Sequence, residues 1–222
     1  MIVFDIDGTI AEAGEPVEYS VAEKIRNLEQ KNIQIVLASG KNNSYLTGFA
    51  RGIGLRNLFI IAENGCVISK PSEFLEIFLV EKSPKILKLK KKVIQRFEDR
   101  IWLQPNKVQL TIFPKDLTIL SEITNFIKTQ IKESVDNLKI YVNVDSIDVL
   151  PNSIDKGIAL RKIKELSGTK DDIIAVGDGE NDVPMLEEAK IKITIREKLK
   201  YIVDAHNFKN IITALDYIFS II

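Results

Sequence analysis

Residues 1–9 read Met-Ile-Val-Phe-Asp-Ile-Asp-Gly-Thr, an apolar and partly β-branched run that ends in two carboxylates and a Gly-Thr pair. Such a run predicts a short buried strand followed by a tight turn. Asp5 and Asp7 are two residues apart, so their side chains lie on one face of that strand. Two adjacent carboxylates repel unless a cation lies between them, and Mg²⁺ prefers oxygen ligands. The stretch indicates a magnesium site, with a plain carboxylate cap on the turn as the alternative.

The alternation of buried strand and helix continues on both sides of a middle segment. Apolar runs predict strands at 33–38, 58–62, 173–176 and 191–195. Helical patterns fall at about 44–53, 155–166, 182–188 and 207–219, and after Ser20, which we expect to cap a helix carrying Val21, Ile25 and Leu28 on one face. Nearly all-apolar strands that alternate with helices imply a parallel sheet covered on both faces.

The middle segment, residues 71–150, has a different pattern. It predicts strands at 74–80, 101–104, 108–113, 139–144 and 147–150, and helices at 84–97 and 117–131. Neighbouring strands joined by short turns favour antiparallel pairs. We therefore expect an α/β fold in which residues 1–70 and 151–222 form a Rossmann-like core with a parallel sheet. Residues 71–150 would form a small α+β domain inserted between Pro71 and Pro151.

Composition excludes several classes of partner. The 31 basic and 31 acidic residues cancel, so no net charge attracts nucleic acid or an anionic membrane. Five lysines at 85–92 interleave with apolar residues at helical spacing, which indicates a solvated face of an amphipathic helix rather than a nucleic-acid patch. One cysteine, no signal segment and no long apolar run predict a cytoplasmic protein without a membrane span. Monomer and homodimer both stay open.

A second acidic motif, Gly177-Asp178-Gly179-Glu180-Asn181-Asp182, directly follows the predicted strand at 173–176. Its glycines allow a tight loop, which places Asp178 at a strand end and Asp182 at a helix start. Two further carboxylates at the same sheet edge would complete an oxygen site for Mg²⁺. The alternative is a turn in which Asp182 only caps a helix.

Two further positions suggest phosphate binding. Ser39 ends the second predicted strand, and its hydroxyl together with the backbone N–H groups of the Gly40 turn can hold a phosphate. Lys156 opens a helix, where a cation is slightly unfavourable with the helix dipole, which is a hint of function. Taken singly, Ser39 could be an ordinary turn residue and Lys156 a surface lysine.

In this order along the chain, the motifs around Asp5-Ile6-Asp7-Gly8-Thr9, Ser39, Lys156 and the 177–182 loop resemble those of the haloacid dehalogenase (HAD) superfamily of phosphatases. The resemblance covers essentially the whole chain and implies a HAD core with a compact cap of the C2 type. Ala62-Glu63-Asn64-Gly65 and the small cap are similar to archaeal phosphoglycolate phosphatases. One departure is Ser-Gly-Lys where many relatives have Thr-Gly-Arg, because Lys41 lacks the bidentate fork of arginine.

The resemblance also implies roles for these residues. Asp5 would be the nucleophile and Asp7 the proton donor and acceptor. Ser39, Gly40, Lys156 and Asn181 would bind the phosphate or substrate. The predicted ligands of Mg²⁺ are Asp5, the backbone carbonyl of Asp7, Asp178 and, directly or through water, Asp182.

The expected partner is a small phosphorylated metabolite. The reaction implied is Mg²⁺-dependent hydrolysis of a phosphomonoester, with 2-phosphoglycolate as the leading substrate. One alternative is a sugar-phosphate phosphatase of the mannosyl-3-phosphoglycerate or sucrose-phosphate type, or a phosphosugar mutase. The non-enzymatic alternative is a phosphate-binding module that has lost its activity.

Overall fold

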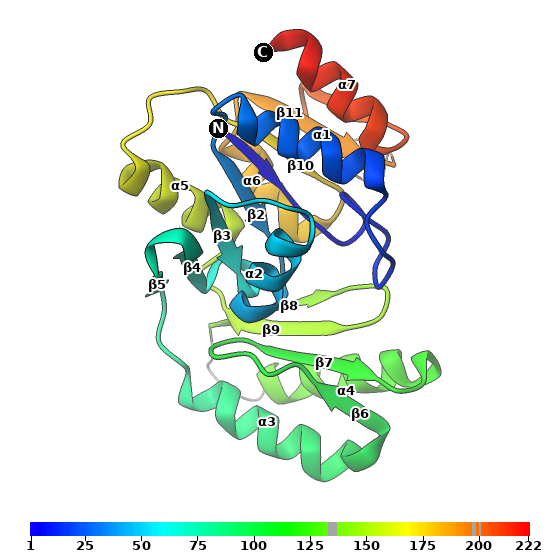
Figure 1. Ribbon diagram of the computed structural model, residues 1–222. Coiled ribbons are helices and arrows are strands. Elements are labelled where there is room, and N and C mark those ends of the chain that lie inside the picture. The colour runs from blue at the N-terminus through cyan, green and yellow to red at the C-terminus, as the bar shows by residue number, and fades with distance from the viewer. Residues whose placement is uncertain (133–136, 197–198, 200) are drawn as a thin grey trace.

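The computed structural model (Figure 1) describes residues 1–132, 137–196, 199 and 201–222. These residues form a large and a small sheet. The large sheet has the order β12 (Ala205–Phe208), β11 (Ile191–Ile195), β10 (Ile174–Gly177), β1 (Ile2–Phe4), β2 (Ile35–Ala38), β3 (Leu58–Ala62), β4 (Val67–Lys70) and β5 (Leu75–Phe78). Neighbours from β12 to β3 are parallel, and β4 and β5 add an antiparallel hairpin at one edge.

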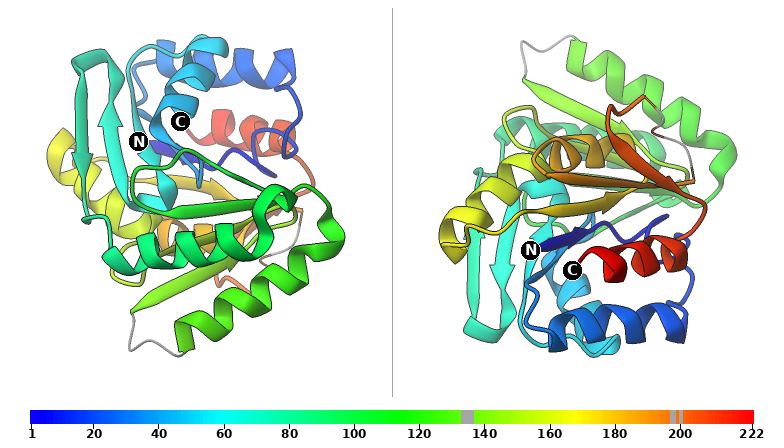
Figure 2. Two further views of the ribbon diagram at one scale, coloured as in Figure 1. Left: turned by 90° about the horizontal axis from the view of Figure 1, so that it is seen from below. Right: turned by 90° about the horizontal axis from the view of Figure 1, so that it is seen from above.

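Helices cover both faces of the large sheet (Figure 2). One face packs against α1 (Tyr19–Gln30), α2 (Asn43–Gly52) and α7 (Ile211–Ile221), and the other against α5 (Lys156–Ser167) and α6 (Val183–Glu187). In β1, Ile2 and Phe4 enter the first core whereas Val3 enters the second, because successive side chains of a strand point to opposite faces. The predicted parallel sheet buried on both faces is confirmed.

The small sheet is antiparallel and belongs to the middle segment. Its order is β6 (Ile101–Leu103), β7 (Leu110–Pro114), β9 (Ile147–Pro151) and β8 (Leu138–Val142). The helices α3 (Pro84–Phe97) and α4 (Leu120–Lys132) cover the face turned away from the large sheet (Figure 1). In β9, Ile147 and Val149 pack toward these helices, whereas Leu150 packs into the core of the large sheet. The α/β core with an inserted α+β unit, here called the cap, is confirmed.

The strand pairing changes where the insertion starts. The strand expected at 74–80 in the cap is β5, which pairs with β4 at the edge of the large sheet. A predicted boundary after residue 70 therefore divides a hairpin of the core. The sequence did not indicate β4, because Val67–Lys70 is only four residues long and gives no clear period. The division into domains stays a prediction, and this pairing favours a junction after Phe78.

Other differences lie at element ends. Helix α1 begins at Tyr19 after Glu18, so Ser20 lies inside the helix and does not cap it. Residues 207–208, expected in the last helix, belong to β12, and α7 begins after Asn210, whose side-chain oxygen accepts from the Thr213 backbone N–H at 3.0 Å. Short 3-10 helices lie at Glu63–Gly65, Pro71–Glu73, Glu98–Arg100, Leu117–Ile119 and Glu180–Asp182. In the described part of the chain, none of the helices has the length and apolarity needed to cross a membrane.

Candidate active site

The strand order brings together motifs that are far apart in the sequence. Because β10, β1 and β2 are parallel neighbours, their C-terminal ends meet at one edge of the sheet. Asp178, Asp5 and Ser39 are the residues that directly follow these three strands. Ligands of open parallel sheets bind at this edge.

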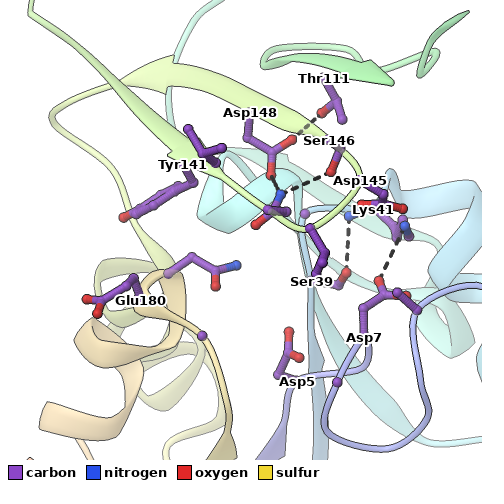
Figure 3. Close-up of a pocket in the computed structure, with 18 of the residues that line it drawn as sticks. Asp5, Asp7, Ser39, Lys41, Thr111, Tyr141, Asp145, Ser146, Asp148 and Glu180 are labelled. Atoms are coloured by element: carbon purple, nitrogen blue, oxygen red, sulfur yellow. Dashed lines mark hydrogen bonds and ion pairs between the residues drawn. The ribbon is translucent and has the colours of Figure 1, made fainter. Parts of the chain in front are cut away.

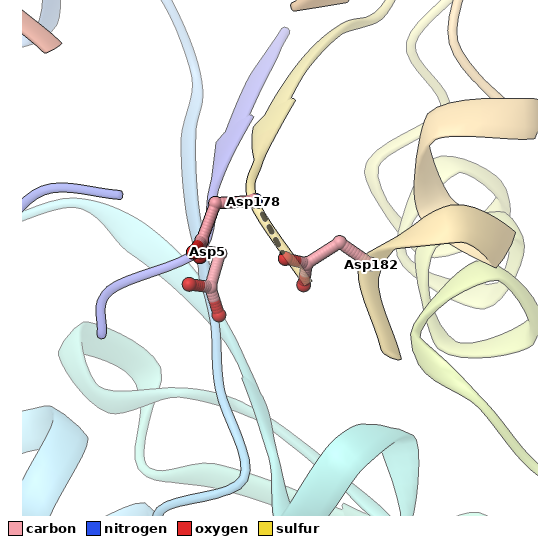
Figure 4. A group of neighbouring side chains, drawn as sticks. All are labelled: Asp5, Asp178 and Asp182. Atoms are coloured by element: carbon pink, nitrogen blue, oxygen red, sulfur yellow. Dashed lines mark hydrogen bonds between the residues drawn. The ribbon is translucent and has the colours of Figure 1, made fainter. Parts of the chain in front are cut away.

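Three carboxylates converge at this edge (Figure 4). One oxygen from each of Asp5, Asp178 and Asp182 lies within 4.8 Å of the other two, and all three residues are buried. Oδ2 of Asp182 accepts hydrogen bonds from the backbone N–H groups of Asp178 and Gly179 at 3.0 and 2.9 Å. Asp182 therefore fixes the shape of the 177–182 loop as well as contributing charge, which is more than a helix cap.

Lys156 is the cation next to this group. Its side chain is fully buried, and Nζ lies 2.7 Å from Asp5 Oδ1 and 2.6 Å from Asp182 Oδ1. Burial alone would lower the pKa of Lys156, but the charges and hydrogen bonds of Asp182 and Asp5 outweigh it and raise the pKa. Lys156 is thus a charged buried residue, and the reading as a surface lysine is excluded.

One ammonium does not balance three carboxylates. When all four groups are ionised, they leave an excess of two negative charges in a buried site. Burial, the charge of Asp182 and that of Asp178 raise the pKa of Asp5 well above its ordinary value, against the opposing charge of Lys156. An oxygen donor set with this excess charge fits a divalent cation such as Mg²⁺, which would hold Asp5 ionised.

Gly8 lets the first motif approach the acidic loop. Its φ is +92°, and a Cβ built there would lie 2.4 Å from Asp178 Oδ2. The next residue, Thr9, donates from its hydroxyl to Asp178 Oδ1 at 3.3 Å. A side chain at position 8 would therefore displace Asp178.

Asp7 lies apart from the group of three carboxylates. Its carboxylate oxygen Oδ2 is 3.3 Å from Nζ of Lys41, and both side chains are partly exposed to the cavity described below (Figure 3). Nζ of Lys41 also lies 5.3 Å from the centre of the Phe113 ring, which the cap supplies. Asp7 thus faces the space between core and cap.

A cavity of about 410 Å³ lies between the core and the cap (Figure 3). Asp5, Asp7, Ser39, Gly40, Asp178 and Asn181 line it from the core, whereas the buried side chains of Lys156 and Asp182 do not. The cap contributes Gln104, Thr111, Phe113, Tyr141, Asn143 and Asp148 among others. Burial, and then the charge of Asp155, raises the pKa of Tyr141 to about 12.

Side chains of the cap hold the turn at Ser39 and Gly40. The hydroxyl of Ser39 accepts from the Lys41 backbone N–H at 3.2 Å. The Gly40 carbonyl accepts from the side-chain amides of Gln104 and Gln109 at 3.1 and 2.8 Å. The cap therefore contacts the predicted phosphate-binding turn directly.

Asp148 is a site residue that sequence reasoning did not identify. The predicted strand at 147–150 contains Asp148, but its sequence indicated no role for this carboxylate. Asp148 lies within β9, is 2% exposed and accepts from the Thr111 hydroxyl at 2.6 Å. Burial raises the pKa of its carboxyl, although hydrogen bonds from Thr111, Asn64 and Asn143 oppose this. The missed signal was one polar residue between Ile147 and Val149 in a predicted strand, which places Asp148 on the face opposite the cap core.

Comparisons with known proteins agree with this geometry. The model of the family described as haloacid dehalogenase-like hydrolase matches residues 2–94 and 80–212. Phosphoglycolate phosphatase 2 of Saccharolobus solfataricus is 28% identical over 207 residues, which are 91% of this chain and 82% of that protein. Phosphoglycolate phosphatase of Methanococcoides burtonii is 26% identical over 230 residues, which are 99% and 96% of the two chains.

Solved structures show the same fold at low sequence identity. A haloacid dehalogenase-like hydrolase from Bacteroides thetaiotaomicron has a TM-score of 0.76 at 16% identity, with 98% of each chain covered. The C-terminal domain of trehalose-6-phosphate phosphatase from C. albicans has a TM-score of 0.76 at 15% identity, with 97% and 89% covered. The chain therefore belongs to the haloacid dehalogenase-like hydrolases, a family of enzymes, and the expected resemblance to archaeal phosphoglycolate phosphatases is confirmed.

Proposed function

We propose that this enzyme hydrolyses a small phosphomonoester in a Mg²⁺-dependent reaction through an aspartyl-phosphate on Asp5. The observation that carries the proposal is the position of Asp5. It lines the cavity beneath the cap, pairs with buried Lys156 at 2.7 Å, and shares a buried oxygen cluster with Asp178 and Asp182. A carboxylate held in this way is suited to attack phosphorus.

Mg²⁺ would be held by Asp5, Asp178 and the backbone carbonyl of Asp7, with Asp182 as the fourth contributor. Both oxygens of Asp182 already accept hydrogen bonds, from Lys156 and from the 178–179 backbone, which favours contact with the ion through water. When bound, the ion neutralises negative charge between the nucleophile and the phosphoryl group.

The chemistry of the side chains divides into two steps. In the first, a bond forms between a carboxylate oxygen of Asp5 and phosphorus, the ester P–O bond breaks, and Asp7 gives its proton to the leaving alkoxide. In the second, water attacks phosphorus, the bond to Asp5 breaks, and Asp7 takes the proton of the water. Asp7 suits this role because it faces the cavity outside the carboxylate cluster.

The predicted residues that line the cavity, Ser39, Gly40 and Asn181, bind the phosphoryl oxygens. Ser39 and Gly40 follow β2, the strand next to β1, and Asn181 lies on the acidic loop. The ammonium of Lys156 contacts two carboxylates and has three N–H donors, so it can stabilise charge at the reacting group.

The leading substrate is 2-phosphoglycolate. Two of the relatives that cover nearly the whole chain are phosphoglycolate phosphatases, at 26–28% identity. The test is a screen for phosphate release from phosphoglycolate, phosphoglycerates, hexose phosphates, sucrose phosphate and nucleotides. Preference for a sugar phosphate would replace phosphoglycolate by the sugar-phosphate alternative.

The reaction itself is tested with Asp5→Asn. Loss of the nucleophile should lower kcat for p-nitrophenyl phosphate by about 10³-fold or more while the protein stays folded. Asp216→Asn is the control, because Asp216 pairs with Lys24 on the exposed surface of α7 and does not line the cavity. Near-wild-type turnover by Asp5→Asn would refute the assignment of Asp5, and no Mg²⁺-dependent phosphate release by the wild type would favour a non-enzymatic module.

A further inference from the structure

Residues 63–65 have an unusual backbone. Glu63, Asn64 and Gly65 have successive φ values of +52°, +53° and +103°, and all three are buried. Left-handed φ costs free energy at non-glycine residues, so such a run persists only where the surroundings impose it. At Gly65, an added Cβ would lie 2.2 Å from the Asp155 carbonyl oxygen, immediately before Lys156. The segment therefore packs closely against the start of the helix that carries Lys156.

The backbone of this segment is hydrogen-bonded to the turn at residues 39–41. The N–H of Glu63 donates to the Lys41 carbonyl at 2.9 Å, and that of Asn64 donates to the Ser39 carbonyl at 3.1 Å. Because both contacts lie within the core, they hold the segment in place independently of the cap.

The Glu63 side chain points from this segment to the cap. Its carboxylate accepts hydrogen bonds from three successive backbone N–H groups, those of Lys107 and Val108 at 2.8 Å and that of Gln109 at 3.0 Å. These residues form the bend between β6 and β7. Hydrogen bonds to a buried carboxylate are stronger than neutral ones, so Glu63 anchors this bend of the cap on the core.

The Asn64 side chain connects both sides at once. Its Nδ2 donates to Asp148 Oδ2 at 2.9 Å and to Gln109 Oε1 at 3.1 Å, both in the cap. Its Oδ1 accepts from Asn181 Nδ2 at 3.0 Å. Asn181 lies in the loop between Asp178 and Asp182, so one fully buried amide joins the cap to the loop that carries two of the carboxylates.

We infer that Asn64 is a positioning residue that couples the seated cap to the metal-binding loop. With the cap in place, Asp148 and Gln109 orient the Asn64 amide, and that amide holds Asn181 and the loop around it. The carboxylates of Asp178 and Asp182 are then kept in the arrangement that binds Mg²⁺. This inference rests on the proposed metal site, but its test does not require turnover.

The test removes the Asn64 side chain without straining the backbone. Asn64→Gly keeps the left-handed conformation and deletes the amide. Titration calorimetry with Mg²⁺ alone should show a dissociation constant raised by about 10- to 100-fold, as for other residues that orient metal ligands. The control is Asn143→Ala, which removes a donor to the same Asp148 carboxylate from within the cap and should change Mg²⁺ affinity much less.

A swap of donor and acceptor distinguishes coupling from a general packing defect. Asn64→Asp and Asp148→Asn should each weaken Mg²⁺ binding, and the double variant, which restores an amide–carboxylate pair, should regain part of it. If the Asn64 variants do not fold, Asp148→Asn alone tests the same coupling from the cap side. A folded Asn64→Gly protein whose Mg²⁺ affinity is within about twofold of wild type would overturn the inference. A wild type that binds Mg²⁺ but releases no phosphate would instead refute the proposed function.

Discussion

The ammonium nitrogen of Lys41 lies 3.3 Å from a carboxylate oxygen of Asp7, under the ring of Phe113 from the cap. Lys41 and Arg196 are the cationic side chains among the described residues that line the cavity. Arg196 is already paired with Glu12, with one contact at 2.8 Å. Lys41 therefore lies beside the proposed proton donor, where the leaving group must pass.

This position predicts that Lys41 favours leaving groups with a carboxylate. Lys41→Met should lower kcat/KM for phosphoglycolate by about 10- to 100-fold, the range of a charge-assisted hydrogen bond, and should lower it less for ethyl phosphate, which lacks the carboxylate. Lys41→Arg, which keeps the charge, should retain part of the preference. Equal losses of kcat/KM for both substrates would show that Lys41 acts only through Asp7. If Arg196→Met, rather than Lys41→Met, removes the preference for phosphoglycolate over ethyl phosphate, the carboxylate contact belongs to Arg196.

The close approach of Gly8 to Asp178 predicts that a side chain at position 8 lowers the free energy of unfolding by more than the backbone strain alone. Gly8→Ala puts a Cβ 2.4 Å from Asp178 Oδ2 at a φ of +92°. Gly14 is the matched control, because its φ is +80° and a Cβ there meets nothing within 4 Å. Gly14→Ala should cost only the backbone strain of about 1–2 kcal/mol, measured by urea unfolding. Gly8→Ala should cost more and should also weaken Mg²⁺ binding; equal costs would contradict the observed contact.

The buried carboxylate cluster predicts stabilisation by divalent cations. Since Mg²⁺ would relieve the excess negative charge of the folded state, a hundredfold excess over its dissociation constant should add about 2.7 kcal/mol to the free energy of unfolding. Thermal unfolding with and without Mg²⁺ at constant ionic strength measures this. Asp178→Asn should remove most of the effect, whereas Asp172→Asn, an exposed partner of Lys190, should keep it. Equal Mg²⁺ responses in both variants would exclude the cluster as the site.

Burial of Asp148 predicts a dependence of stability on pH. Its folded pKa is raised by burial above the ordinary value of 3.8, so the protonated form is favoured in the folded protein. This contribution is fully present below pH 3.8 and is lost as the pH rises through the folded pKa. In the Asp148→Asn variant, this side chain stays neutral at both pH values. The free energy of unfolding of the variant minus that of wild type should therefore be larger at pH 7 than at pH 4. A difference that does not change with pH would show that the surrounding donors fully compensate burial.

The alternation of apolar runs and helices predicted the core because local sequence largely determines it. Strands such as β1 and β2 are short, nearly all apolar and bounded by Asp or Ser-Gly. Such an uninterrupted apolar run indicates burial on both faces of the sheet. In the hairpin β4–β5, β4 was not predicted and β5 was assigned to the cap, because which sheet a strand joins depends on its partner strand. That information is absent from Val67–Lys70 and Leu75–Phe78 taken separately.

For the residues around Asp5, the local sequence and the tertiary structure also determined different things. The sequence by itself determined that carboxylates, a serine and a lysine stand at the ends of predicted elements. The shared face expected for Asp5 and Asp7 does not describe the structure, because β1 ends at Phe4 and Asp7 pairs with Lys41 outside the carboxylate cluster. Only the tertiary structure decided that Lys156 is buried between Asp5 and Asp182, and that Asn64 and Asp148 meet across the cap. Consecutive residues are enough to reveal the apolar pattern of a helix or strand. Contacts across 84 or 151 positions depend instead on how the sheets pack and on which polar groups are left to satisfy each other in the interior.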